Sequence, residues 1–194
     1  MKKCLSFFLC LCLLIGFCTP AALAKGKKKT LDFSTTDRDG EKWTEDDLGD
    51  YKLIMLNFWE PWCPPCVGEM PELQELYEAY RERGFLILGI YSTEDMEEDV
   101  DQVLADCGTA YPILHYCKAF DKYQTGYVPT TIFANAKGEV LGDAEIGSKS
   151  YEEWEELILS FELLDDEVPE AAAPGGDSLT RPDGDGKTML GAAG

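Results

Sequence analysis

Two cysteines with only two residues between them, Cys63 and Cys66, lie in the stretch WCPPC. Cysteines at this spacing can form a disulfide that opens and closes, in which one thiolate attacks the disulfide of another molecule. A helix that begins between them favours that thiolate at Cys63, because a helix N-terminus offers free N–H groups and partial positive charge. Cys66, one turn into the same helix, is then placed to attack the mixed disulfide and release the partner.

Two further cysteines, Cys107 and Cys117, leave other uses of the pair open. The Cys63–Cys66 disulfide can be purely structural, or four thiolates can bind zinc, although structural zinc sites more often use two closely spaced pairs. Cys107 and Cys117 flank a strand-like run that can bring them together, so we predict a structural disulfide between them. A second redox pair and two independent thiols are the alternatives. We expect no metal and no cofactor, because His115, the only histidine, has no metal-ligand spacing.

Two continuous apolar runs, 53–59 and 85–90, have the length and pattern of central strands that are covered on both faces. The segment between them has apolar residues at spacings of three and four and stops before Gly84, which predicts a helix. A weaker helical pattern covers 94–106. This order places WCPPC at the carboxyl end of the first strand, where open α/β sheets hold their functional sites. The apolar positions of the first helix are Met70, Leu73, Leu76, Tyr77 and Tyr80.

The pattern changes after the second helix. Residues 130–134 and 139–146 flank a turn that contains a glycine, which predicts an antiparallel hairpin. A last helix at 151–161 has one apolar side, and residues 31–43 predict a small hairpin ahead of the first strand. We therefore predict an α/β layered sandwich with parallel and antiparallel strands in one sheet, flanking helices and an N-terminal hairpin.

The first 24 residues have the pattern of a secretory signal: a basic start, an apolar run and a small-x-small sequence that ends at Ala24. We expect cleavage after Ala24, because the apolar run of about 13 residues is shorter than the roughly 20 that a spanning helix needs. A lipid on Cys18 or an uncleaved anchor is the alternative, although the bulky Phe17 disfavours lipidation. The protein would then be secreted, periplasmic or held at the outer face of the cytoplasmic membrane.

The chain is acidic, with 37 acidic against 17 basic residues among 194 and a formal charge of −20. This balance argues against nucleic acid as a partner. Removal of residues 1–24 leaves 15 basic residues, a formal charge of −22 and four cysteines, an even number in an oxidising compartment. We expect a basic leader at 25–30, one domain at 31–165 and a disordered acidic tail rich in Pro, Gly and Ala at 166–194.

Two motifs together resemble a known family. The run FWEPWCPPC at 58–66 and the later Val128-Pro129-Thr130-Thr131 are similar to the extracytoplasmic thioredoxin-like proteins of the TlpA/ResA type. The resemblance covers about residues 31–164. It implies a thioredoxin-like three-layer sandwich.

The resemblance also implies roles for individual residues. Cys63 would attack disulfides, Cys66 would resolve the mixed disulfide, and Pro129 would be cis and face both cysteines. A cis bond would leave the Val128 backbone free to pair with an extended peptide. We therefore assign substrate binding to Trp62, Val128 and Pro129.

Two departures bear on the mechanism. Many thioredoxin-like proteins have a buried acid in the first long strand that takes the proton of the resolving cysteine, but this strand has Asn57 there. ResA-like members have a glutamate three residues after the second cysteine, and Glu69 occupies that position. Glu69 would then take the proton, or it would only complement the helix dipole. Glu60 is an additional acid near the thiols, which should oppose a thiolate.

The leading hypothesis is an exported thiol-disulfide oxidoreductase that reduces or isomerises disulfides in exported proteins or in apocytochrome-like peptides. A membrane donor of the thiol-relay type would supply its electrons. Pro64 and Pro65 have no N–H, so a Cys63 thiolate loses two donors, which favours a reducing couple. We expect Cys63 to be exposed and Cys66 to be shielded.

Three alternatives remain. A net disulfide-forming oxidase is the runner-up within the same enzyme class. A peroxiredoxin should have threonine three residues before the reactive cysteine, where this chain has Glu60. A copper-binding assembly factor should have its cysteines one residue further apart together with a distal histidine.

Overall fold

The computed structural model describes residues 29–164, and in this part of the chain five strands form one mixed sheet. Their order is β5-β4-β3-β6-β7, so β3 (Leu53–Phe58) lies at the centre. β3 is parallel to β4 (Phe85–Tyr91) and antiparallel to β6 (Thr130–Asn135). The edge strands are β5 (Ile113–His115) and β7 (Val140–Ile146). The predicted fold class is confirmed.

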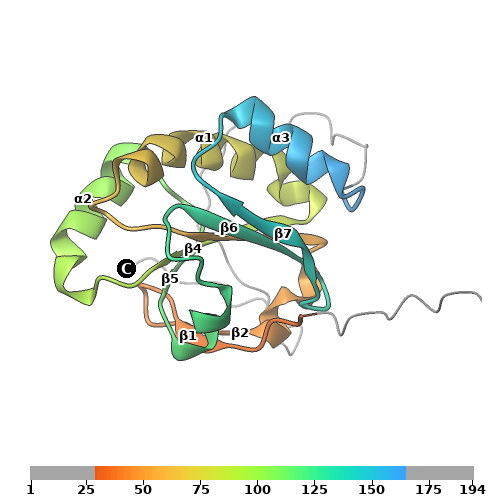
Figure 1. Cartoon of the computed structure of the whole chain (residues 1–194), viewed down its shortest axis with the longest axis horizontal. Coiled ribbons are helices and arrows are strands. Elements are labelled where there is room, and N and C mark those ends of the chain that lie inside the picture. The colour runs from red at the N-terminus through yellow and green to blue at the C-terminus, as the bar shows by residue number, and fades with distance from the viewer. Residues whose placement is uncertain (1–28, 165–194) are drawn as a thin grey trace, which may run out of the picture.

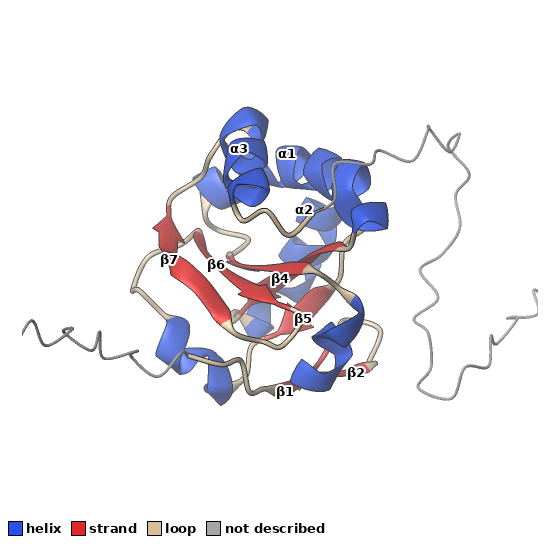
Figure 2. Ribbon diagram, turned by 90° about the vertical axis from the view of Figure 1, so that its right-hand side faces the viewer, coloured by secondary structure: helices blue, strands red, loops and turns tan. Residues whose placement is uncertain are grey.

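Helices cover one face of this sheet, and a hairpin lies against the other (Figure 1). The helices are α1 (Pro64–Tyr80), α2 (Glu97–Cys107) and α3 (Tyr151–Ser160). The hairpin of β1 (Ser34–Thr36) and β2 (Lys42–Thr44) is antiparallel, as predicted. Figure 2 shows the same layers from the side. Short 3-10 helices connect these elements: η1 (Glu45–Asp50), η2 (Arg81–Arg83), η3 (Glu94–Met96) and η4 (Lys118–Tyr123).

The alternation of side chains along β3 links the two layers. Asn57 points to the helices, where it contacts Glu69 of α1. The next residue, Phe58, points to the other face and packs edge-on against Phe120 of η4, with ring centroids 5.8 Å apart. All six residues of β3 are buried. The continuous apolar run in the sequence therefore has its expected cause, a strand covered on both faces.

The helix that follows β3 is confirmed in its position and in its inward face. All five apolar positions predicted from the spacing are buried. The helix begins at Pro64, between the two cysteines, with Cys63 as its N-cap. Past the end of α1, Gly84 has a φ of +92°, a left-handed conformation that glycine adopts without strain. This glycine turns the chain directly into β4.

The predicted disulfide between Cys107 and Cys117 is wrong, because both cysteines are free. Cys107 ends α2 on the helix-covered face, where its thiol lies 3.7 Å from the carbonyl oxygen of Val67 in α1. Cys117 precedes η4 on the opposite face, where Phe120 packs against Phe33 next to the hairpin. The sheet thus separates the two segments, whereas a disulfide needs Cα atoms within about 7 Å.

Some predictions concern the ends of the chain. The secretory signal at 1–24 and the tail at 166–194 lie outside the described residues, as does most of the basic leader. Among residues 29–164, no helix has the length and apolar character needed to cross a membrane.

Candidate active site

Cys63 and Cys66 form a disulfide at the start of α1, with their Cα atoms 5.3 Å apart. Cys63 is the N-cap residue, and its sulfur accepts a hydrogen bond from the backbone N–H of Cys66 at 3.3 Å. Pro64 and Pro65, the residues between them, have no N–H to offer. The helix start therefore directs the N–H of Cys66 at the sulfur that would carry the thiolate.

The exposure of the two cysteines differs from the expectation in degree. Cys66 is fully buried as predicted, but Cys63 retains only 4% of its surface instead of being openly exposed. The cause is the loop before β6, which brings the carbonyl oxygen of Val128 to 3.6 Å from the Cys63 sulfur. Of the two cysteines, only Cys63 retains any exposed surface.

The peptide bond between Val128 and Pro129 is cis, as the resemblance implies. Hydrogen bonds hold this loop at both ends: the Thr130 hydroxyl donates to the carbonyl of Tyr127 at 2.7 Å, and the N–H of Gly147 donates to the carbonyl of Pro129 at 2.9 Å. These bonds tie the loop to the start of β6 and to the residue that follows β7. The Val128 carbonyl is thereby fixed in front of the disulfide.

Exposed apolar side chains surround the disulfide. Among the described residues, four large hydrophobic side chains are exposed, and three of them flank the site: Trp62 at 58%, Tyr127 at 67% and Ile146 at 54%. Trp62 precedes Cys63, Tyr127 precedes Val128, and Ile146 pairs with Thr130 in the sheet. Exposed apolar groups that gather on one face indicate a surface that binds another molecule.

Glu69 lies three residues after Cys66 on the same face of α1, and it is buried at 3% exposure. The amide of Asn57 donates to one carboxyl oxygen at 3.1 Å, and the backbone N–H of Lys149 donates to the other at 3.3 Å. Burial raises the pKa of Glu69 from 4.5 to about 7, although these hydrogen bonds oppose the shift. A group that titrates near neutrality inside the protein can exchange a proton with a neighbouring thiol.

Asn57 of β3 holds the Glu69 carboxyl from the strand side. Its amide group donates to Glu69 and also to the hydroxyl of Thr131, its partner across the β3–β6 ladder, at 3.1 Å. The amide cannot take a proton, but it fixes the orientation of the carboxyl that can. Sequence reasoning considered both residues but did not predict this contact between them.

Glu60 lies beside Cys63, as the sequence suggests, and its carboxylate contacts the loop after β4. It is buried, and its carboxylate accepts hydrogen bonds from the N–H and hydroxyl of Ser92 and from the hydroxyl of Thr93. Its backbone carbonyl accepts from the N–H of Cys63 at 3.1 Å. The carboxylate thus binds the loop after β4. Its expected opposition to a thiolate at Cys63 stays a prediction.

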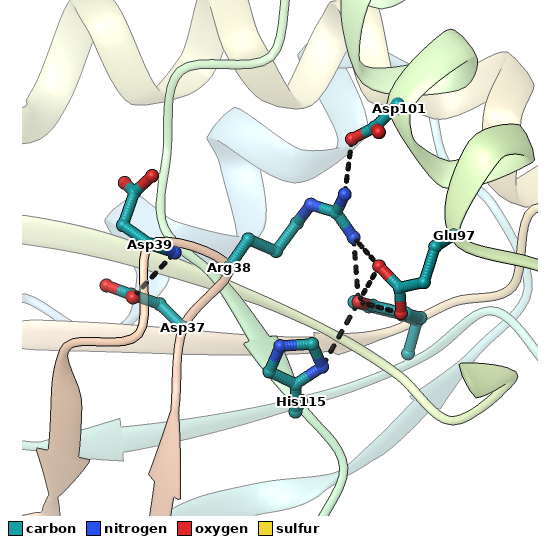
Figure 3. Close-up of polar contacts among 7 residues, drawn as sticks. Asp37, Arg38, Asp39, Glu97, Asp101 and His115 are labelled. Carbon is teal, nitrogen blue, oxygen red and sulfur yellow. Dashed lines mark hydrogen bonds and ion pairs between the residues drawn. The ribbon is translucent and has the colours of Figure 1, made fainter.

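A polar cluster lies next to that loop (Figure 3). The hydroxyl of Tyr91, at the end of β4, contacts Glu97, Arg38 and the Nδ1 atom of His115 at 2.8, 2.8 and 3.1 Å. Arg38 comes from the turn of the N-terminal hairpin and also pairs with Asp101. Sequence reasoning missed this cluster, because its members are far apart along the chain. Among the described residues, no group of three His, Cys, Asp or Glu side chains could hold a metal ion.

Comparison with known proteins places the chain in a family. The model of the AhpC/TSA family matches residues 27–142. The chain belongs to the AhpC/TSA family. Among similar proteins, the thiol-disulfide oxidoreductase ResA of Oceanobacillus iheyensis is 40% identical over 91 residues, 46% of this chain and 47% of that relative. The ResA of Halalkalibacterium halodurans is 32% identical over 128 residues, 65% of this chain and 72% of that relative.

A solved structure agrees with this placement in the AhpC/TSA family. The thioredoxin-family thiol:disulfide interchange protein from Chlorobium tepidum superposes with a TM-score of 0.61 at 26% identity, over 71% of this chain and 98% of that one. The chain thus spans about half the length of one ResA relative and nearly all of this structural one. The predicted resemblance and the thioredoxin-like fold are confirmed.

Proposed function

We propose that this AhpC/TSA family protein is a thiol-disulfide oxidoreductase that reduces or isomerises disulfides in other proteins or peptides. The observation that carries the proposal is the Cys63–Cys66 disulfide at the N-cap of α1, faced by the cis bond before Pro129. The similarity to proteins named thiol-disulfide oxidoreductases supports it. The exposed apolar side chains around the disulfide suit polypeptide substrates better than small molecules.

The reaction would proceed in two exchanges. In the reduced protein the Cys63 thiolate attacks one sulfur of a substrate disulfide, and the other substrate sulfur leaves as a thiolate that takes a proton. Cys66 then attacks the Cys63 sulfur of the mixed disulfide and releases the second substrate thiol. Two electrons pass to the substrate, and the protein ends as the Cys63–Cys66 disulfide.

Glu69 would act in the second exchange. Cys66 must lose its proton to attack, and it lies in an interior without exposure. Because its pKa is about 7, the Glu69 carboxyl can accept that proton near neutral pH and return it later. The hydrogen bond from Asn57 keeps the carboxyl oriented for this step. A role limited to the helix dipole would not need burial, because the dipole acts on exposed carboxylates as well.

The contacts of the Cys63 sulfur favour a reducing couple. A strong oxidant stabilises its thiolate with several donors, so that the reduced form is preferred. Among the described residues, the sulfur has the N–H of Cys66 as a donor, while the carbonyl oxygen of Val128, an acceptor, also faces it. An anion at this position is therefore only weakly stabilised.

The location and the partners are further parts of the proposal. The pattern of residues 1–24 favours export, so the substrates would be disulfide-containing exported proteins or apocytochrome-like peptides. Reduction outside the cytoplasm needs a source of electrons, which a membrane donor of the thiol-relay type would supply. The acidic charge argues against nucleic acid as a partner.

The reduction potential of the Cys63–Cys66 pair tests the proposed direction. The pair is equilibrated with dithiothreitol redox buffers in a Cys107→Ser, Cys117→Ser variant, so that one couple reports. We expect a potential near the roughly −270 mV of thioredoxin. A potential above about −180 mV, the value of an isomerase, would reject the reductant assignment and favour the oxidase.

A further inference from the structure

Glu60 is a buried acid next to the candidate active site. It is 6% exposed, and its three donors, the N–H and hydroxyl of Ser92 and the hydroxyl of Thr93, are all neutral. Burying a carboxylate costs free energy that hydrogen bonds only partly offset. The contacts join the turn before Cys63 to the loop after β4, two segments about thirty residues apart. The acid therefore fixes one loop against the other.

The hydroxyl of Thr93 extends this contact to Trp62. Its oxygen accepts a hydrogen bond from the indole N–H of Trp62 at 3.2 Å while its own proton goes to Glu60. The indole N–H can only donate, so the Thr93 oxygen accepts from Trp62, and the hydroxyl proton of Thr93 is left for Glu60. Aligned bonds of this kind polarise and strengthen one another. Glu60, Thr93 and Trp62 thus form one hydrogen-bond chain.

The loop that carries Thr93 is anchored from its other side as well. Tyr91, two residues earlier, ends β4 with its hydroxyl in the cluster of Arg38, Glu97 and His115 (Figure 3). The hydrogen-bond chain therefore connects Trp62 to a strand end that is itself fixed by the hairpin and by α2. A hydrogen bond to a residue that is held in place restricts the indole ring more than a hydrogen bond to a mobile loop.

The indole ring of Trp62, which this hydrogen bond restricts, is also exposed to solvent. Trp62 is 58% exposed and adjacent to Cys63, so its apolar faces remain open while its N–H is bound. An aromatic side chain that is ordered before binding loses less conformational entropy when a partner contacts it. Aromatic rings of this kind are common anchors in protein recognition. Tyr127 and Ile146, on the other side of the disulfide, offer the same apolar chemistry.

We propose that Glu60 is a positioning residue that, through Thr93, holds Trp62 as a fixed apolar platform for a bulky apolar side chain next to the reacting cysteine of a substrate polypeptide. The inference rests on the proposed disulfide exchange and adds a determinant of substrate choice to it. Glu60 acts through Thr93 and Trp62 and does not touch the reacting sulfur atoms. Its loss should weaken the binding of such polypeptides and leave the exchange chemistry unchanged.

The test compares two disulfides of different size. One is a peptide disulfide with leucine beside each cysteine, and the other is hydroxyethyl disulfide, which is too small to cover Trp62. Glu60→Ala should raise KM for the peptide about 2- to 10-fold, the range expected when one side chain must be ordered on binding. The kcat for the peptide and the turnover of hydroxyethyl disulfide should stay unchanged. Glu98→Ala, an exposed acid on α2, is the control and should change neither.

Two further variants separate positioning from a general loss of structure. Thr93→Val keeps the shape but removes the hydroxyl, so it should raise the peptide KM as much as Glu60→Ala, and the double variant should add nothing. Glu60→Gln can still bond to Ser92 and Thr93, but its amide has one acceptor oxygen where the carboxylate has two, so it should raise the peptide KM less than Glu60→Ala does. The indole N–H signal of Trp62 in NMR spectra should shift in Glu60→Ala and in Thr93→Val.

The outcomes are distinct. An unchanged peptide KM in Glu60→Ala and Thr93→Val would overturn the inference, and so would an equal loss with both disulfides. If the parent protein reduces neither disulfide, the proposed function itself fails.

Discussion

Replacing Glu69 with glutamine should remove a pH-dependent loss of stability from the oxidised protein. The pKa of this carboxyl is about 7 in the folded protein and 4.5 as its ordinary value. Between these values the folded state holds a proton that the unfolded state has released, so stability falls as the pH rises. Below about pH 4.5 both states are protonated and the effect is absent. Above about pH 7 the effect is complete and amounts to roughly 3 kcal/mol.

Urea unfolding of oxidised Glu69→Gln and its parent at about pH 4 and about pH 8 measures this difference. Both proteins carry Cys107→Ser and Cys117→Ser, so that no free thiol rearranges the disulfide. Glutamine keeps an oxygen for the Asn57 amide, and it cannot ionise. We expect the stability of the variant relative to the parent to rise by roughly 3 kcal/mol between the two pH values.

The control is Glu75→Gln, an exposed acid on the same helix, whose difference from the parent should stay nearly constant. A constant difference for Glu69→Gln as well would refute the reasoning, because the carboxyl would then titrate alike in the folded and unfolded protein. The proton-transfer role given to Glu69 would lose its physical basis.

Three other predictions follow from the same contacts. Glu69→Gln should slow peptide disulfide reduction most near pH 7, because Cys66 loses its proton acceptor. Stopped-flow measurements across about pH 5 to 9 check this, and a ratio of variant rate to parent rate that does not change with pH would show that Glu69 has no such role. Limiting iodoacetamide should label Cys63 of the reduced protein before Cys107, because the N–H of Cys66 favours a thiolate at Cys63, whereas burial and Asp106 raise the pKa of the Cys107 thiol. Mass spectrometry that finds Cys107 labelled first would contradict this order. Gly89→Ala should destabilise the protein by about 1–3 kcal/mol, because a Cβ would lie 2.6 Å from Cδ1 of Ile113 and 3.3 Å from ring atoms of Trp59 and Tyr111, all three of which are buried. Gly49→Ala, with nothing within 4 Å, should not, and equal urea midpoints for the two would contradict the overpacking argument.

The elements of this fold could be predicted because their patterns are local. The apolar run at 53–58 and the three- and four-residue spacing after Pro64 each give the element that forms there. The helix predicted at 94–106 agrees in part: its first residues form the 3-10 helix η3, and α2 begins only at Glu97. Patterns of this kind depend on which face of an element is buried and not on where its neighbours lie.

The candidate site could be predicted in part. Cys63 and Cys66 follow from their spacing at one helix start, whereas Glu69 and the cis bond before Pro129 followed from the resemblance. The partners of Glu60 could not be predicted, because Ser92 and Thr93 reach it only through the pairing of β3 with β4.

The error on Cys107 and Cys117 has a related cause. Their separation along the chain suits a closed loop, but the sequence does not state on which side of the sheet each segment lies. The contacts of Cys107 with α1 and of η4 with the N-terminal hairpin decide that question, and both are contacts over long sequence separations.

The central claim is that Cys63 attacks and Cys66 resolves. The most direct test is to mix reduced Cys66→Ser with a disulfide-bonded peptide, quench with acid, and locate the trapped peptide by mass spectrometry. The account predicts one mixed disulfide, on Cys63, that persists because Cys66 is no longer there to resolve it. The matched variant Cys63→Ser should trap none, because Cys66 has no exposed surface. Trapping on Cys107 or Cys117, or equal trapping by Cys63→Ser, would contradict the account.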